Sequence, residues 1–401
     1  MVGGLLKVTV EKTVNTLLFL YILLKPFYLW SSGLPQIADF ILVILIIVAV
    51  FKVKFKRNEK IPYIIFTLVS ILLLYHVIFV NSIWHIVLGN ENSLLFNSLF
   101  YIFNVLAMLA VLYLYYDKVE SLLKSIYYGV VCSVGIQCIL YFIIGGGNLR
   151  ETIFFNNPNQ LAYYALFCLA YLLIVERVLN FRPLIYIFAM LGCLFLIFIS
   201  ASLGALAGAI FMLSAYSFVS RKKGVVRFVT TSITIPSLAF LYLLMFDNPL
   251  IYRINFLNTI VWRFNNSSVS GEGFIVERAY DRILNHPEYW FFGAGEGDYT
   301  RFDSVASYEI HSTLGTMFFS YGIIGFFLFS FMLIYVFHKS RWIYAYPIIA
   351  ILIYGLTHNG LRNSMLWLMF SLIILVFSII IEGKESEPFN KRAGKSDETA
   401  T

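Results

Sequence analysis

Charged residues are scarce in this chain of 401 residues: Asp, Glu, Lys and Arg make up 13% of it, while apolar residues make up 60%. Soluble domains carry roughly 25% charged residues and about 45–50% apolar ones. Mean hydropathy is correspondingly high, at +0.81. A soluble globule needs a polar surface that this composition cannot supply, whereas a bilayer solvates an apolar surface. The sequence therefore predicts an all-α polytopic membrane protein.

Cysteine is also rare, which argues against both a disulfide framework and a cysteine metal site. All four cysteines fall inside apolar stretches, with no spacing typical of metal ligands, so we expect neither a metal nor another cofactor. They are Cys132, Cys138, Cys168 and Cys193. Ionisable groups within the apolar stretches are few as well, namely Lys25, Asp39 and His76. Proton-coupled transporters place carboxylates near the middle of the membrane, so this scarcity opposes transport.

Apolar stretches long enough to cross a bilayer recur along the chain. A helix needs roughly 20 residues for this, and the first stretch lacks the small-residue cleavage site of a signal peptide. We predict about twelve spans in one transmembrane domain covering 1–401, near 13–30, 36–51, 61–80, 94–116, 125–144, 160–175, 184–199, 204–219, 228–246, 313–337, 343–357 and 364–381. One large loop, 247–312, is expected to contain short helices and to carry function. The polar tail 383–401 is expected to be disordered and cytoplasmic.

The basic residues predict the orientation of these spans. With both termini in the cytoplasm, 21 of the 29 Lys and Arg residues fall on the cytoplasmic side and seven fall outside, as the positive-inside rule requires. The net charge of +7 thus reflects membrane topology, and we expect no nucleic-acid partner. All seven outer basic residues are arginine: Arg150, Arg253, Arg263, Arg278, Arg282, Arg301 and Arg362. Arginine binds phosphate oxygens bidentately, so this face suggests phosphate recognition, although chance and anchoring at the membrane interface would give the same pattern.

Several outer residues are candidates for a site. His311 closes the large loop and is either a general base or a hydrogen-bonded interfacial histidine. Arg278 and Arg282 lie four apart in a helical-looking stretch over 274–284, so they share one face of either a phosphate clamp or a salt-bridged surface helix. Asn159 follows Arg150 at the start of a span, where asparagines also serve as caps. The glycines at 293–297 do not follow a strand, so we interpret them as a backbone turn rather than a dinucleotide fingerprint.

The order of four motifs resembles the bacterial O-antigen ligase and polymerase superfamily. They are Asn157-Pro158-Asn159-Gln160-Leu161-Ala162, Ser200-Ala201-Ser202-Leu203-Gly204-Ala205, Gly293-Ala294-Gly295-Glu296-Gly297-Asp298-Tyr299 after His286-Pro287, and His311-Ser312 followed by Gly322 and Gly325. The resemblance covers roughly 150–380. Two departures stand out: Leu203 replaces an arginine of many members, so that phosphate ligand is absent or supplied elsewhere, and Ser312 replaces an asparagine.

This resemblance implies a fold, a reaction and a set of roles. It implies metal-independent, inverting glycosyl transfer on the periplasmic side of the bacterial inner membrane, from an oligosaccharide carried on undecaprenyl pyrophosphate. His311 and Arg278 are the expected catalytic residues. The residues expected to bind pyrophosphate or glycan are Arg282, Arg150, Arg362, Asn159 and Tyr299.

The resemblance leaves the acceptor open. We favour polymerisation of O-antigen or capsule repeat units, with lipid-linked glycans as both donor and acceptor and a chain-length regulator as a further candidate partner. A ligase would transfer the glycan to phosphorylated lipid A–core and would need more outer basic residues. The loop instead offers aromatic side chains that suit sugar rings, namely Tyr280, Tyr289, Trp290, Tyr299 and Tyr308. A flippase, the alternative from another class, is expected to have short loops throughout.

Overall fold

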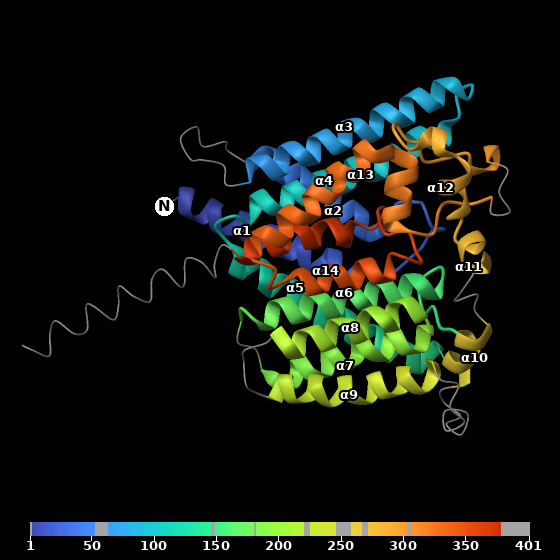
Figure 1. The fold of residues 1–401 in the computed structure, drawn as a ribbon. Coiled ribbons are helices and arrows are strands. Elements are labelled where there is room, and N and C mark those ends of the chain that lie inside the picture. The colour runs from blue at the N-terminus through green and yellow to red at the C-terminus, as the bar shows by residue number, and fades with distance from the viewer. Residues whose placement is uncertain are drawn as a thin grey trace, which may run out of the picture.

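The computed structural model describes residues 2–52, 63–145, 149–179, 182–219, 225–245, 258–266, 272–302 and 307–377, and no strand occurs within these ranges. The helices before the large loop are α1 (Val2–Leu24), α2 (Ile37–Lys52), α3 (Ile64–Val87), α4 (Asn92–Leu114), α5 (Val119–Ile144), α6 (Pro158–Glu176), α7 (Pro183–Ser200), α8 (Leu203–Val219) and α9 (Val225–Met245). After the loop come α13 (Thr313–Lys339), α14 (Ala345–Tyr354) and a C-terminal helix, Ser364–Phe377. Figure 1 shows these helices side by side in one bundle.

The predicted spans coincide with these helices, one helix to each span. In the described part of the chain, six helices are long and apolar enough to cross a membrane: α3, α4, α5, α6, α7 and α13. The apolar helices α8, α14 and Ser364–Phe377 are shorter. The chain is therefore a polytopic membrane protein, whereas the full count of twelve crossings stays a prediction.

Apolar side chains cover the outside of the bundle as well as its interior. On α3, Ile64, Leu68 and Leu72 are each about half exposed, while Phe66 and Leu73 on the other face are fully buried. A soluble protein rarely exposes so continuous an apolar surface. Hydrocarbon chains of a bilayer are the solvent that suits it.

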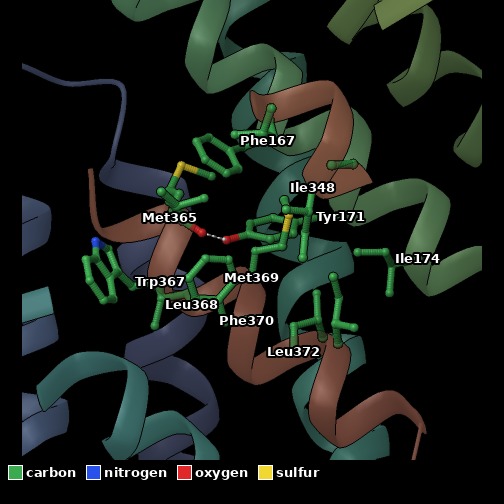
Figure 2. Close-up of a cluster of buried hydrophobic side chains, with 14 of the residues drawn as sticks. Phe167, Tyr171, Ile174, Ile348, Met365, Trp367, Leu368, Met369, Phe370 and Leu372 are labelled. Atoms are coloured by element: carbon green, nitrogen blue, oxygen red, sulfur yellow. Dashed lines mark hydrogen bonds between the residues drawn. The ribbon is translucent and has the colours of Figure 1, made fainter. Parts of the chain in front are cut away.

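The C-terminal helix lies in the core of the bundle. Figure 2 shows its side chains packed against residues of α6 and α14, among them Phe167, Tyr171 and Ile348. Buried polar groups here find partners, since the Tyr171 hydroxyl donates to the Met365 carbonyl at 2.8 Å. Every residue of α6 from Leu161 to Val175 is buried, so α6 is a central helix of the bundle rather than a lipid-facing one.

One end of the bundle gathers the segments predicted to lie outside. The short helices α10 (Asn258–Asn266), α11 (Glu272–Glu277) and α12 (Asp281–Asn285) lie there, opposite the N-terminus (Figure 1). The connections meet at this end: the Asn156 amide donates to the Trp30 carbonyl at 3.0 Å, and the Thr313 N–H donates to the Gly355 carbonyl at 2.7 Å. The segments predicted to share one side of the membrane therefore share one end of the fold.

The large loop contains short helices, as predicted, but the expected helix over 274–284 is wrong. It breaks into α11 and α12, because Ala279 between them has a φ of +56°. Arg278 and Arg282 consequently do not share a helical face. Parts of the loop, 247–257, 267–271 and 303–306, and the predicted tail 383–401 lie outside the described residues.

Candidate functional site

The loop is anchored to the bundle by a glycine turn that docks into a break in α13. Gly322 interrupts this helix with a φ of +63°, and the Gly295 N–H donates to the Ser320 carbonyl beside the break at 2.8 Å. A Cβ on Gly322 would lie 2.2 Å from the Phe291 carbonyl oxygen. Glycine alone combines positive φ with so close an approach. The predicted backbone turn at 293–297 is confirmed, since Gly293, Gly295 and Gly297 all have positive φ.

The turn places the carboxylate of Glu296 inside the bundle. Its side chain is 0% exposed and accepts hydrogen bonds from the hydroxyls of Tyr101 at 2.7 Å and Tyr321 at 2.9 Å. The other carboxylate oxygen accepts from Nε and Nη2 of Arg362 at 2.8 and 2.6 Å. A buried charge needs both a countercharge and hydrogen bonds, and Glu296 has both. This network fixes Arg362 in the connection between α14 and the C-terminal helix.

Arg362 reaches a second carboxylate as well. Its Nη2 lies 2.8 Å from Oε2 of Glu309. Although burial opposes its charge, Glu296 and Glu309 together raise the pKa of Arg362 well above its ordinary value. Its charge is therefore balanced within the protein, and a phosphate would have to compete with two carboxylates for it. Arg362 is therefore better suited to form a rigid part of the cavity wall than to bind a phosphate, the role predicted for it.

A cavity of about 520 Å³ opens against this wall. Three predicted residues line it, His311, Asn159 and Arg362, together with Glu309 and His358. Rings and neutral amides make up another part of its lining, including Tyr28, Phe155, Tyr163, Tyr164, Tyr354, Asn157 and Gln160. A third part is apolar and comes from α2 and α4: Phe40, Val43, Phe96, Leu99, Phe100 and Phe103. Ionisable, sugar-compatible and lipid-compatible surfaces thus share one cavity.

His311 is oriented by the loop that precedes it. Its Nδ1 lies 2.9 Å from the backbone carbonyl of Glu309, an oxygen that can only accept. Nδ1 must therefore carry the proton, and in the neutral ring Nε2 keeps its lone pair. This tautomer is the one that a general base facing the cavity requires.

His358 lies across from His311, with 6.5 Å between the ring centroids. Burial, followed by the charges of Arg278, His311, Arg150 and Arg263, lowers its pKa to about 3, so the ring is neutral at physiological pH. Its Nδ1 contacts the Thr357 hydroxyl at 2.9 Å, whereas its Nε2 is buried with no hydrogen-bond partner in the described part of the chain. Three of these groups are arginines, and their positive charge marks this side of the cavity as a place for an anion.

Two of the predicted arginines, Arg278 and Arg150, lie near His358 and are held by residues next to it or in the cavity lining. The Arg278 Nη1 donates to the Thr357 carbonyl at 3.2 Å. The Arg150 Nη2 donates to Oδ1 of Asn159 at 2.7 Å, and burial followed by the charge of Arg263 lowers the pKa of Arg150. Arg150 and Arg278, which are far apart in sequence, therefore both adjoin the cavity, Arg150 through Asn159 and Arg278 beside His358.

The other two predicted site residues, Arg282 and Tyr299, do not line the cavity. Arg282 is fully buried within the loop, where it donates to the Tyr308 carbonyl at 2.6 Å and lies over the rings of Tyr299 and Phe302. Tyr299 touches the site only indirectly, since its hydroxyl accepts from Arg362 at 3.3 Å. Trp290 of the loop likewise donates to a loop carbonyl, and none of the five loop aromatics lines the cavity. Arg282 thus holds the loop together.

Sequence reasoning missed Glu296, Glu309 and Arg263 as site residues. Glu296 was visible only as part of a glycine turn, and nothing in its spacing relates it to Arg362. Glu309 precedes His311 by two residues, a signal that was available. Arg263 was one of the outer arginines, with no feature that set it apart from the rest.

Comparison of the sequence with models of known protein families gave no match, and comparison with curated proteins gave none either. Within the described ranges, no three His, Cys, Asp or Glu side chains gather as a metal site would require.

Proposed function

We propose that this protein polymerises oligosaccharide repeat units carried on a membrane lipid pyrophosphate, by metal-independent inverting glycosyl transfer at the cavity. The observation that carries the proposal is the combination found there. A base-competent His311 and an apolar wall line one space of about 520 Å³, and a group of arginines adjoins it behind His358 and Asn159. A lipid-linked sugar diphosphate has three parts of matching chemistry: sugar, diphosphate and hydrocarbon chain.

The transfer step needs a base and a place for the leaving group. Nε2 of His311 takes the proton from the acceptor hydroxyl while its oxygen attacks the anomeric carbon. The bond between that carbon and the diphosphate oxygen breaks, and the lipid diphosphate leaves with the electron pair. Arg278 and Arg150 stabilise this negative charge where it develops. Each proton and charge in the step is thereby accounted for without a metal ion.

The apolar wall supports a lipid-linked donor. Phe40 on α2 and Leu99 on α4 both line the cavity and are 54% and 55% exposed. The cavity is therefore bounded by side chains that would otherwise face lipid. A polyprenyl chain could lie along them while its diphosphate reaches the arginines.

The lining favours a sugar acceptor over a phosphorylated one. Its lysine and arginine side chains are Lys25, which pairs with Asp39 at 2.9 Å, and Arg362. The rest of the lining includes neutral amides and aromatic rings such as Asn157, Gln160 and Tyr163. Arg362, the arginine that lines the cavity, is already paired with Glu296 and Glu309 and so is not free for an acceptor phosphate. We therefore favour the polymerase over the ligase that acts on lipid A–core.

A deletion strain separates the alternatives. Cells without a polymerase should still attach a single repeat unit to lipid A–core but make no ladder of longer chains. Loss of the single-unit band, with lipid-linked polymer accumulating, would identify a ligase. Accumulation of lipid-linked single units on the cytoplasmic face would identify a flippase.

Site variants in the complemented strain test the chemistry. His311→Ala should lower the rate of polymerisation by about 10²–10⁴-fold at normal membrane abundance. His286→Ala is the matched control, because His286 pairs with Glu288 in the loop and does not line the cavity. If Arg278 grips the diphosphate bidentately, Arg278→Lys should fail nearly as badly as Arg278→Ala. Long-chain product from His311→Ala at the wild-type rate would remove this residue from the mechanism.

A further inference from the structure

Arg263 lies on a loop helix that is docked onto the bundle. Ile260 and Val261 of α10 are buried with Ala201, at the turn between α7 and α8. Leu203, in the first turn of α8, packs against the same cluster. Arg263 follows Val261 by two residues, so this packing fixes its place on the fold.

Three guanidinium groups from separate segments act on the same histidine. Arg150 precedes α6, and its Nε donates to the Ser200 carbonyl at 3.0 Å, next to the Ala201 on which α10 and its Arg263 are docked. Arg278, just after α11, donates to the Thr357 carbonyl beside His358 at 3.2 Å. The charges of all three arginines lower the pKa of His358. Arg263 also acts directly on Arg150. The three arginines therefore form one group, which adjoins the cavity through His358 and Asn159.

Several buried nitrogen atoms in this group have no hydrogen-bond partner in the described part of the chain. The Nε atoms of Arg263 and Arg278 are buried without a hydrogen-bond partner in the described part of the chain, and so is Nε2 of His358. Arg278 has a carboxylate nearby, but Glu277 lies 3.5 Å away and is half exposed. Like charges brought together with unsatisfied buried donors are costly unless a ligand neutralises them. An anion that accepts several hydrogen bonds at once would do so.

We propose that Arg263 is the third arm of a diphosphate-binding site that it forms with Arg150 and Arg278. Each guanidinium presents a planar fork that suits two phosphate oxygens, and three forks suit the two linked phosphate groups of a lipid diphosphate better than a single carboxylate. The α6 and α8 helices both start at this end of the bundle, and their N-termini favour negative charge there. This inference rests on the proposed function, because the diphosphate is that of the glycan donor.

Binding of undecaprenyl diphosphate to the full-length protein in lipid nanodiscs tests the inference. Arg263→Gln should weaken binding by about 10- to 100-fold, the loss typical of one charge-assisted contact. Arg263→Lys keeps the positive charge but loses the planar fork, so it should recover little of this affinity, as expected for Arg278→Lys. Arg341→Gln is the control, because Arg341 is exposed at the end of the bundle that carries α13's last turn, away from the cavity. Thermal midpoints confirm that each variant is folded.

A second pair of variants separates charge from packing. Since Leu203 packs on the α10 cluster, Leu203→Arg in the Arg263→Gln background returns a guanidinium to the same neighbourhood and should recover part of the lost affinity. Equal binding by the wild type and Arg263→Gln would overturn the role of Arg263 and leave the proposed function standing. A wild-type protein that binds no undecaprenyl diphosphate would overturn the proposed function, and this inference with it.

Discussion

The buried carboxylate of Glu296 offers a sharp test of how the loop is held in the bundle. Glu296→Gln keeps the size of the side chain but removes the charge that faces Arg362. It also leaves the hydroxyls of Tyr101 and Tyr321 donating to a neutral group. The substitution therefore weakens the five hydrogen bonds that this carboxylate accepts, the fifth coming from the Asn359 amide at 3.4 Å.

The expected loss is large because the Glu296 side chain is fully buried. Removing one partner of a buried ion pair typically destabilises a protein by about 3–5 kcal/mol. Arg362 keeps Glu309 as a partner, so we expect a loss of about 3 kcal/mol, at the lower end of that range. Glu309→Gln is the matched control: its side chain is 29% exposed, and a pair open to water is worth about 0–1 kcal/mol.

Equilibrium unfolding of the purified protein in mixed micelles, with increasing denaturing detergent, measures both free energies. Tryptophan fluorescence reports the transition, because Trp367 lies in the buried core. Combining Glu296→Gln with Arg362→Met removes both charges and should recover part of the stability, since apolar replacements of a buried pair are often neutral. A loss from Glu296→Gln no greater than that from Glu309→Gln would refute the reasoning.

Two further predictions concern backbone strain and pH. Gly322→Ala should lower the free energy of unfolding by at least about 1–3 kcal/mol, because the added Cβ meets the Phe291 carbonyl at positive φ. Gly135→Ala is the control, since its Cβ would meet open space and should not destabilise α5. The thermal midpoints of the two variants measure the difference. The pKa of His358 is about 3 when folded and about 6.5 when unfolded, so between these values the unfolded chain binds the extra proton and stability falls as pH falls. When the pH falls from 7 to 5, the free energy of unfolding of the wild type should therefore fall by about 2 kcal/mol more than that of His358→Gln, measured by the same detergent titration. Equal decreases in the two proteins would contradict the burial of this ring.

The sequence alone determined the class of the protein and the position of its helices. Apolar stretches must be helical in a bilayer, because their backbone groups have no water to bond with. The predicted spans therefore coincide with helices even where, as in α14, the helix is only 10 residues long. The glycine turn was also predictable, since positive φ at closely spaced positions needs glycine.

The site was only partly predictable, for a physical reason. His311, Asn159 and Arg362 were found because each ends or opens a span, where outer residues must converge. Arg278 and Arg282 were treated alike because their spacing assumes an unbroken helix, and the left-handed Ala279 breaks it.

Only the tertiary structure decided which charged side chains lie beside each other in the bundle. Whether an arginine is free for an anion depends on which carboxylates pack beside it: Arg362 has two, whereas Arg263 and Arg150 share a neighbourhood dominated by other cations. The carboxylate of Glu296 lies 66 residues from Arg362 in sequence, and Arg263 reaches the region of Leu203 only because α10 docks on α8. Electrostatic interaction depends on distance in space, which local sequence patterns do not specify.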